Sequence, residues 1–128
     1  MLYDSINKRI PINKGWSGDR KYCALDDVGN KFLLRIADIS QLERKHQELE
    51  YMGKIDLLGL PICKPLEVGM CEEGVYSIQS WIEGKDMYDC IDGLSDMEIY
   101  NYGYMSGQIL KKMHSIPAPA EREDWARY

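Results

Sequence analysis

The sequence predicts an α+β fold: a five-stranded antiparallel sheet with one helix packed on it, followed by a helical extension. Two observations predict this arrangement. Five short stretches with strand character are separated by turn residues, and two longer stretches have the apolar spacing of helices. One of these helices interrupts the run of strands, and the other follows it. The 128 residues are enough for one ordinary domain with a buried core.

The first three predicted strands cover residues 9–14, 21–25 and 31–36, where apolar side chains alternate with polar ones or form a mostly apolar run. Turn residues at 15–19 separate the first two strands. Residues 26–30, with the sequence Asp-Asp-Val-Gly-Asn, have the composition of a hairpin loop. We therefore expect these three strands to form a meander.

A helix is predicted from Ser40 to about residue 58. Ser40 and Glu43 have the spacing of a capping box, in which the serine hydroxyl and the glutamate carboxylate each bind a free backbone amide. The sequence Gly-Leu-Pro at 59–61 ends this helix. Two further strands are predicted at 65–70 and 75–82, joined by a turn at 71–74.

A second long helix is predicted after a break in the strand pattern at residues 83–85. Ser95 and Glu98 repeat the capping-box spacing, and the helix is expected to reach about His114. Prolines at 117 and 119 then end it. Residues 121–128 have the composition of a further helix start.

Composition and charge exclude several classes of function. Sixteen Lys and Arg against 21 Asp and Glu give a net charge of −5, whereas nucleic-acid-binding proteins usually carry a basic face. The four cysteines are widely spaced and only two histidines occur, so we expect reduced thiols and no metal site. No apolar run is long enough for a membrane span, and the first residues do not have the pattern of a secretion signal or transit peptide. A cytoplasmic protein that binds neither nucleic acid nor membranes is expected.

Residues 15–18, Gly-Trp-Ser-Gly, lie between two predicted antiparallel strands. Glycine lets backbone amides approach an anion closely, and Ser17 adds a hydroxyl for a phosphate oxygen. Many hairpins carry two glycines for turn geometry alone. From this segment by itself, a simple turn is favoured over phosphate binding.

Arg35 interrupts the apolar run of the third strand. A permanently charged side chain is costly to bury unless it is paired, so Arg35 either faces solvent or has a carboxylate partner. Pattern alone favours solvent. Glu48, which lies between apolar positions of the following helix, is the expected partner, with Glu43 and Glu50 as rivals.

These features occur in one order: a glycine loop, a charged residue on the third strand, a glutamate on the next helix, and a strand that runs into a break at 83–84. In this respect the sequence resembles the aminoglycoside phosphotransferase family of kinase-like small-molecule kinases. The resemblance implies a protein-kinase-like small lobe with its hinge at residues 1–84, then a linker and a long helix at 85–128 that begin a C-terminal lobe. The segments that carry it are residues 14–22, 32–36, 43–52, 60–66, 80–84 and 108–116.

The resemblance implies that five residues position the phosphates of a nucleotide. Gly15, Ser17 and Gly18 would form the nucleotide-positioning loop, with backbone amides and the Ser17 hydroxyl on the β- and γ-phosphates. Arg35 matches the third-strand lysine that contacts the α- and β-phosphates, and Glu48 matches the glutamate that orients it. Arginine replaces the commoner lysine and presents a planar fork instead of a point charge.

The resemblance also implies how the base of the nucleotide is held. Leu33 would lie over the adenine ring, while the carbonyl of Ser80 and the amide of Ile82 would bind the purine edge. The expected cofactor is ATP or GTP with magnesium. The residues that would coordinate the magnesium ion are expected outside this chain.

The family's catalytic loop, an H-G-D-x-x-x-x-N stretch, and its metal-binding aspartate follow the long helix, and the sequence ends at Tyr128 before either appears. His114 matches the end of the helix and does not replace them. We therefore expect no catalytic residue here and no turnover by the chain alone. The hydroxylated acceptor, an aminoglycoside or another small molecule, would also need the larger lobe.

Two other interpretations stay open. A non-enzymatic module would keep this fold to bind nucleotide or to self-associate, because the apolar residues of the long helix would lack large-lobe neighbours. An unrelated α+β binding domain would use the glycine loop as a turn only. ATP binding that depends on Arg35 would separate the phosphotransferase interpretation from this last one.

Overall fold

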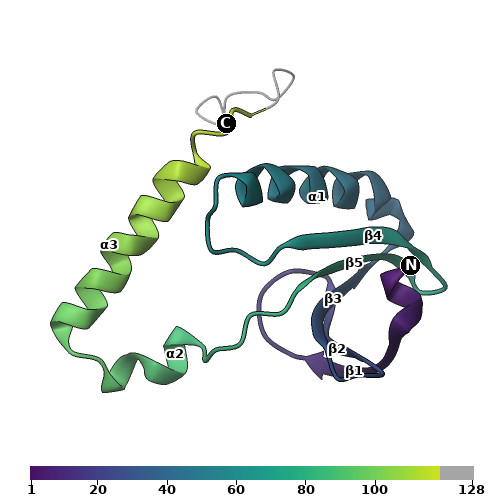
Figure 1. The fold of residues 1–128 in the computed structure, drawn as a ribbon, viewed down its shortest axis with the longest axis horizontal. Helices are drawn as coiled ribbons and strands as arrows, with labels where there is room; N and C mark the ends of the chain where they lie inside the picture. The colour runs from purple at the N-terminus through teal and green to yellow at the C-terminus, as the bar shows by residue number, and fades with distance from the viewer. Residues whose placement is uncertain (119–128) are drawn as a thin grey trace. The chain divides into compact units, whose positions relative to one another are not determined.

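The computed structural model describes residues 1–118, so the helix start expected at 121–128 lies outside the described residues. The chain forms two compact units, Met1–Gly84 and Lys85–Tyr128. The first unit contains the sheet and one long helix, and the second contains the helical extension (Figure 1).

The first unit is built on a five-stranded sheet whose neighbouring strands are all antiparallel. Its strand order is β1-β2-β3-β5-β4, so the first three strands form the predicted meander. This sheet and the helices confirm the α+β fold. The strands are β1 (Ile6–Ile12), β2 (Arg20–Asp26), β3 (Lys31–Ala37), β4 (Pro65–Cys71) and β5 (Gly74–Ser80).

The register of the sheet determines which side chains share a face. In β3, Leu34 and Ile36 point to one face, and Leu33 and Arg35 point to the other, because side chains alternate along a strand. Residues directly opposite one another on paired strands point to the same side. The face of Arg35 therefore also carries its cross-strand neighbours, Lys21 of β2 and Ser77 of β5.

The buried apolar core lies on the face of Leu34. The 3₁₀ helix η1 (Leu2–Ser5) packs against this core, and the ring of Tyr3 stacks on the ring of Tyr76 with their centroids 4.2 Å apart. Each core residue is at most 2% exposed, so this face is held together mainly by apolar burial. The core residues are Ala24, Leu34, Ile36, Tyr76 and Ile78.

Glu67 of β4 fastens η1 to the sheet. Its carboxylate accepts hydrogen bonds from the backbone amides of Leu2 at 3.1 Å and Tyr3 at 3.0 Å, and from the hydroxyl of Tyr76 at 3.0 Å. Hydrogen bonds to an ionised acceptor are stronger than those between neutral groups. One side chain therefore connects the N-terminal segment with both β4 and β5.

The helix α1 (Leu42–Leu57) packs mainly along β4 and also contacts β5 (Figure 1). Gln79 of β5 lies opposite Leu33, and its amide donates to the sulfur of Met52 at 3.5 Å. This contact places α1 on the face of Leu33 and Arg35, opposite the buried core. The helix and the site residues of β3 therefore share one side of the sheet.

The capping box expected at Ser40 and Glu43 was wrong. A short 3₁₀ helix, η2 (Ile39–Gln41), precedes α1, and Asp38 caps this turn by accepting from the backbone amide of Ser40 at 2.9 Å. The N-cap of α1 itself is Gln41, which makes no side-chain capping hydrogen bond. The sequence reasoning missed this because it treated the start of the helix as one continuous α-helical turn.

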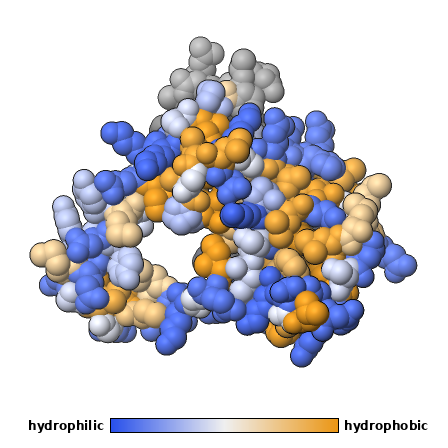
Figure 2. All heavy atoms as spheres, in the orientation of Figure 1, coloured by the Kyte–Doolittle hydropathy of each residue, from blue (hydrophilic) through white to orange (hydrophobic). Residues whose placement is uncertain are grey.

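The second unit contains α2 (Met87–Cys90), the 3₁₀ helix η3 (Ile91–Gly93) and α3 (Asp96–Met113). At the start of α3, Ser95 accepts from the amide of Glu98, and the Glu98 carboxylate accepts from the amide of Ser95, both at 3.1 Å. This second capping box is confirmed. Figure 2 shows hydrophobic residues at the surface among hydrophilic ones. Among the described residues, no helix is long and apolar enough to cross a membrane.

Candidate functional site

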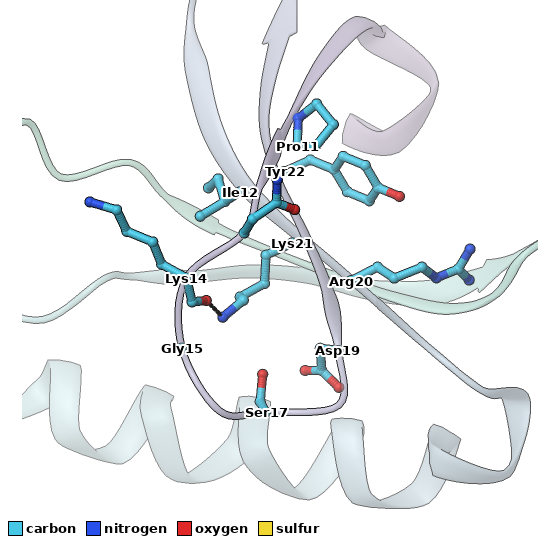
Figure 3. Close-up of a pocket in the computed structure, with 10 residues that line it drawn as sticks. Pro11, Ile12, Lys14, Gly15, Ser17, Asp19, Arg20, Lys21 and Tyr22 are labelled. Carbon is cyan, nitrogen blue, oxygen red and sulfur yellow. Dashed lines mark hydrogen bonds between the residues drawn. The ribbon is translucent and has the colours of Figure 1, made fainter.

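The loop between β1 and β2 borders an open pocket of about 290 Å³, lined by Ser17, Asp19 and Lys21 among others (Figure 3). Gly15 has a φ of +93°, a backbone conformation that residues other than glycine rarely adopt. The side chains of Ser17 and Asp19 lie on the inner side of the loop, as Figure 3 shows. The glycine therefore shapes a turn that presents polar groups toward the sheet face of Arg35.

Arg35 of β3 reaches this loop. Its Nε donates to Oδ2 of Asp19 at 2.9 Å, and its Nη2 donates to Oγ of Ser17 at 3.0 Å. The Arg35 side chain is 26% exposed, so it is partly withdrawn from solvent and has a carboxylate partner. The alternative in which Arg35 simply faces solvent is therefore wrong.

The expected direct ion pair between Arg35 and Glu48 was also wrong. Lys45, on the first turns of α1, lies between them: its ammonium donates to Oδ2 of Asp19 at 2.5 Å and to Oε2 of Glu48 at 3.2 Å. Arg35 and Glu48 are thus joined through Asp19 and Lys45. The reason is that Asp19, from the loop, fills the position beside Arg35 that the helix glutamate was expected to occupy.

Lys45 is the most deeply buried charged group of this network, with only 5% of its side chain exposed. Glu48 is 44% exposed and also accepts from Arg44 at 3.2 Å, so its carboxylate faces outward. A buried ammonium without an anion is costly. Asp19 and Glu48 together therefore compensate the charge of the Lys45 side chain in this buried position.

The ionisation of Asp19 reflects its two cationic neighbours. Burial of Asp19 raises its pKa, but the hydrogen bond and charge of Lys45 and the charge and hydrogen bond of Arg35 lower it. The opposing effects leave the pKa below the ordinary value for aspartate. The carboxylate is therefore ionised at neutral pH, where it compensates Lys45 and Arg35.

Lys21 adds a third cation to the same face. It lies directly opposite Arg35 on the neighbouring strand, an arrangement that destabilises a sheet when the two charges are alike. The Lys21 ammonium turns into the loop and donates to the carbonyl of Lys14 (Figure 3). A Cβ on Gly15 would meet this ammonium, which is the mobile end of a long side chain, so the positive φ and not the space is what requires glycine here. This concentration of cations beside a glycine loop suits a polyanion.

A family model described as the phosphotransferase enzyme family matches residues 8–128. This chain belongs to the phosphotransferase enzyme family. The match covers most of the sequence and confirms the resemblance to aminoglycoside phosphotransferases. No curated protein matches the chain. The five-stranded sheet with α1 is a kinase-like small lobe, and α3 belongs to its helical extension.

The residues that are expected to contact the purine base of the nucleotide lie near the end of β5 in this phosphotransferase. Leu33 is on the face of Arg35 and pairs with Gln79, next to Ser80. The amide of Ser80 donates to the carbonyl of Lys64, and its hydroxyl accepts from the amide of Lys64 at 2.7 Å. Ile82 follows β5 in a stretch without regular structure and is exposed.

The structure places Gly18 in the same loop as Gly15 but gives it a different role. An added Cβ at Gly18 would meet no atom within 4 Å, and its φ is outside the left-handed region. Glycine at this position is therefore not required by the folded backbone. Within residues 1–118, no group of three or more His, Cys, Asp or Glu side chains is arranged to hold a metal ion.

The sequence reasoning missed Asp19, Lys21 and Lys45 as site residues of this phosphotransferase. Lys45 lies three positions before Glu48, so the two share a helix face, and this spacing could have shown that a cation accompanies the glutamate. Asp19 follows the glycine loop directly. A carboxylate beside a proposed phosphate loop is unexpected for anion binding and could have indicated an internal partner for Arg35.

Proposed function

We propose that the unit Met1–Gly84 binds a nucleoside triphosphate, ATP or GTP with magnesium, as the nucleotide-positioning lobe of a phosphotransferase. The acceptor would be a hydroxyl of a small molecule such as an aminoglycoside. One observation carries this proposal: the guanidinium of Arg35 contacts both Ser17 and Asp19 of the glycine loop. The loop and the third-strand cation therefore face one another, as phosphate binding requires.

The chemistry of these groups fits a triphosphate. Arg35 offers a planar fork of donors that matches phosphate oxygens, and Ser17 supplies a hydroxyl donor beside it. The like-charged pair Lys21 and Arg35 would gain from an anion between or beside the two charges. Magnesium would neutralise part of the phosphate charge, and the family resemblance assigns its ligands to the larger lobe.

The end of β5 supports a position for the base. Leu33 lies two residues before Arg35 on the same sheet face, so an apolar ring stacked on Leu33 would keep its phosphates near Arg35. Backbone groups of Ser80 and Ile82 would bind the purine edge where the chain leaves the sheet. Purine recognition through backbone groups leaves both ATP and GTP as candidates.

The test is a calorimetric titration of the whole chain with ATP and GTP in the presence of magnesium. We expect binding that weakens at least about tenfold in Arg35→Ala, because a charge-assisted bidentate contact is lost. Arg9→Ala is the matched control, because Arg9 pairs with Glu73 and the ring of Tyr22, on the other face of the sheet. Equal binding by wild type and Arg35→Ala would contradict the proposal, and so would no binding at millimolar nucleotide.

A second candidate function, self-association, is favoured by the surface of α3. This helix exposes many large apolar or aromatic side chains, and such surfaces commonly form protein interfaces. Light scattering of the whole chain over a range of concentrations tests it, with the dimer mass expected at high concentration and a constant monomer mass contradicting it. The exposed side chains are Met97, Tyr100, Tyr102, Tyr104, Met105 and Leu110.

A further inference from the structure

Two cations converge on a single oxygen at the loop. Oδ2 of Asp19 accepts from Nε of Arg35 at 2.9 Å and from Nζ of Lys45 at 2.5 Å. Arg35 comes from the sheet and Lys45 from α1, so two separate elements direct positive charge at the same point. Beside them, the hydroxyl of Ser17 accepts from Nη2 of Arg35 at 3.0 Å.

The position of the Asp19 oxygen has the surroundings that a phosphate oxygen requires. A carboxylate oxygen and a phosphate oxygen carry similar charge and accept the same donors, from guanidinium and ammonium groups alike. Asp19 is only 14% exposed, so the point where the cations meet is partly shielded from water. Electrostatic interactions are stronger in such a position than at an open surface.

Charge balance shows what would follow if Asp19 left. Arg35 and Lys45 carry two positive charges, and Asp19 and Glu48 carry two negative charges, so the network as it stands is neutral. Without Asp19, one positive charge would be uncompensated, and Lys45 would keep only Glu48 as a partner. A nearby polyanion would restore the balance.

Few side-chain contacts restrain the loop that carries Asp19. Gly15 and Gly18 flank the turn, and an added Cβ at Gly18 would meet no neighbouring atom within 4 Å. The Trp16 side chain between them is fully exposed and anchors nothing. The Asp19 carboxylate is therefore held chiefly by Arg35 and Lys45, the two groups that an anionic ligand would also engage.

We propose that Lys45 is a second phosphate-binding residue, and that the Asp19 carboxylate occupies the phosphate position until a nucleotide displaces it. This inference rests on the proposed function, and it adds a binding residue on α1 and an internal competitor in the loop. Arg35 and Lys45 exchange one anion for another, and Glu48 holds the Lys45 ammonium during the exchange. No covalent bond changes.

The first test removes the competitor. Asp19→Asn keeps the size of the side chain and loses its charge, so ATP with magnesium should bind at least about threefold more tightly than to wild type. Inorganic triphosphate, which has no base, should show the same gain. Glu72→Gln is the matched control: it removes one exposed negative charge in the β4–β5 turn and should leave both affinities unchanged.

The second test removes the cation. Lys45→Met should weaken binding of ATP and of inorganic triphosphate at least about tenfold, and Lys45→Arg should restore part of it. Lys54→Met, which removes an exposed lysine from the last turn of the same helix, should bind as wild type does. Combining Asp19→Asn with Lys45→Met should abolish the gain of the first variant, because the released cation is then absent.

The outcomes separate this inference from the proposed function. If Asp19 serves only to tie the loop to α1, Asp19→Asn will bind nucleotide equally or more weakly, and the inference is overturned while the Arg35-dependent binding of wild type stands. A gain seen with ATP but not with inorganic triphosphate also overturns it. If neither wild type nor Asp19→Asn binds any of these ligands, both proposals fail. Circular dichroism of each variant confirms that it is folded.

Discussion

Gly15 and Gly18 belong to one loop, yet only one of them is needed by the folded backbone. Gly15 has a φ of +93°, which residues with a Cβ rarely adopt. Gly18 has no such conformation, and an added Cβ there would meet no atom within 4 Å. Gly15 therefore shapes the loop, whereas the small size of Gly18 would matter only when a ligand approaches.

We therefore expect Gly15→Ala to lower the free energy of unfolding by about 1–2 kcal/mol, because alanine is strained in this backbone conformation. Gly18→Ala should change it by less than about 0.5 kcal/mol, as an unobstructed surface substitution does. Urea denaturation of both variants measures these values. Equal losses from the two variants would mean that the loop does not hold Gly15 in this conformation.

Glu67 shows how several hydrogen bonds outweigh burial at one carboxylate. Burial raises the pKa of Glu67, but the amide of Tyr3, the hydroxyl of Tyr76 and the amide of Leu2 favour the ionised form and lower it below its ordinary value. For Tyr76, burial and then the hydrogen bond and charge of the Glu67 carboxylate raise the pKa to about 12. Both shifts favour an ionised Glu67 beside a neutral Tyr76.

A pH dependence of stability follows. A carboxyl group whose pKa is lowered by folding stabilises the native state above its unfolded pKa, about 4.3 for glutamate, and loses this effect as the pH falls through the folded value. Glu67→Gln should therefore be less stable than wild type at pH 7, and the difference should shrink below about pH 4. Denaturation curves across this range measure it. A difference independent of pH would show that the charge of Glu67 contributes nothing.

At the level of single residues, local sequence could identify the glycine loop and Arg35 as features with a special environment. It could not identify the partner of Arg35. Asp19 is 16 positions from Arg35 and Lys45 is ten, and their contacts depend on how β2, β3 and α1 are placed in space. Sequence spacing within the helix favoured Glu48 as the partner. The loop carboxylate filled that position because Asp19 directly precedes β2, the strand that pairs with β3, and so lies beside Arg35.

At the level of elements, the two predicted capping boxes had different outcomes, and the difference has a physical cause. Ser95 begins α3 directly, so its side chain meets the amide of Glu98. At α1, a 3₁₀ turn precedes the helix: Asp38 caps that turn, and Gln41 begins α1 without a side-chain cap. The short α2 and η3 were not predicted, because elements of three or four residues are too short for an apolar period to be visible.

The confirmed capping box allows a test on α3. Ser95→Ala should lower the stability of this helix by about 1 kcal/mol, because the amide of Glu98 loses its acceptor. Ser106→Ala is the matched control: the Ser106 hydroxyl donates to the carbonyl of Tyr102 inside the helix, and alanine is a better helix former. Hydrogen exchange of the α3 amides measures both variants. Faster exchange is expected only for Ser95→Ala, and unchanged exchange would contradict a stabilising cap.

At the level of the whole molecule, several cations outside the site form ion pairs with carboxylates. Arg9 and Arg20 both contact Glu73, at 2.5 and 3.2 Å. Lys31 contacts Glu83 at 2.9 Å. The glycine loop differs from these pairs, because three cations, Lys21, Arg35 and Lys45, gather there beside two carboxylates, Asp19 and Glu48. With the net charge of −5, positive charge is therefore gathered in a small cluster and not spread over an extended face. Such a distribution suits a small anion better than a long one.

The last prediction follows from this distribution: the chain should discriminate a mononucleotide from a nucleic acid. A nucleic acid needs a row of cations that neutralise successive phosphates, whereas the site offers one cluster within a negatively charged surface. In fluorescence anisotropy at about 150 mM salt, a labelled ATP should bind, and labelled duplex DNA and single-stranded RNA should not. Unlabelled ATP should displace the labelled nucleotide. Salt-sensitive binding of DNA or RNA would show that the cations form an extended face. The prediction that this protein does not bind nucleic acid would then be wrong.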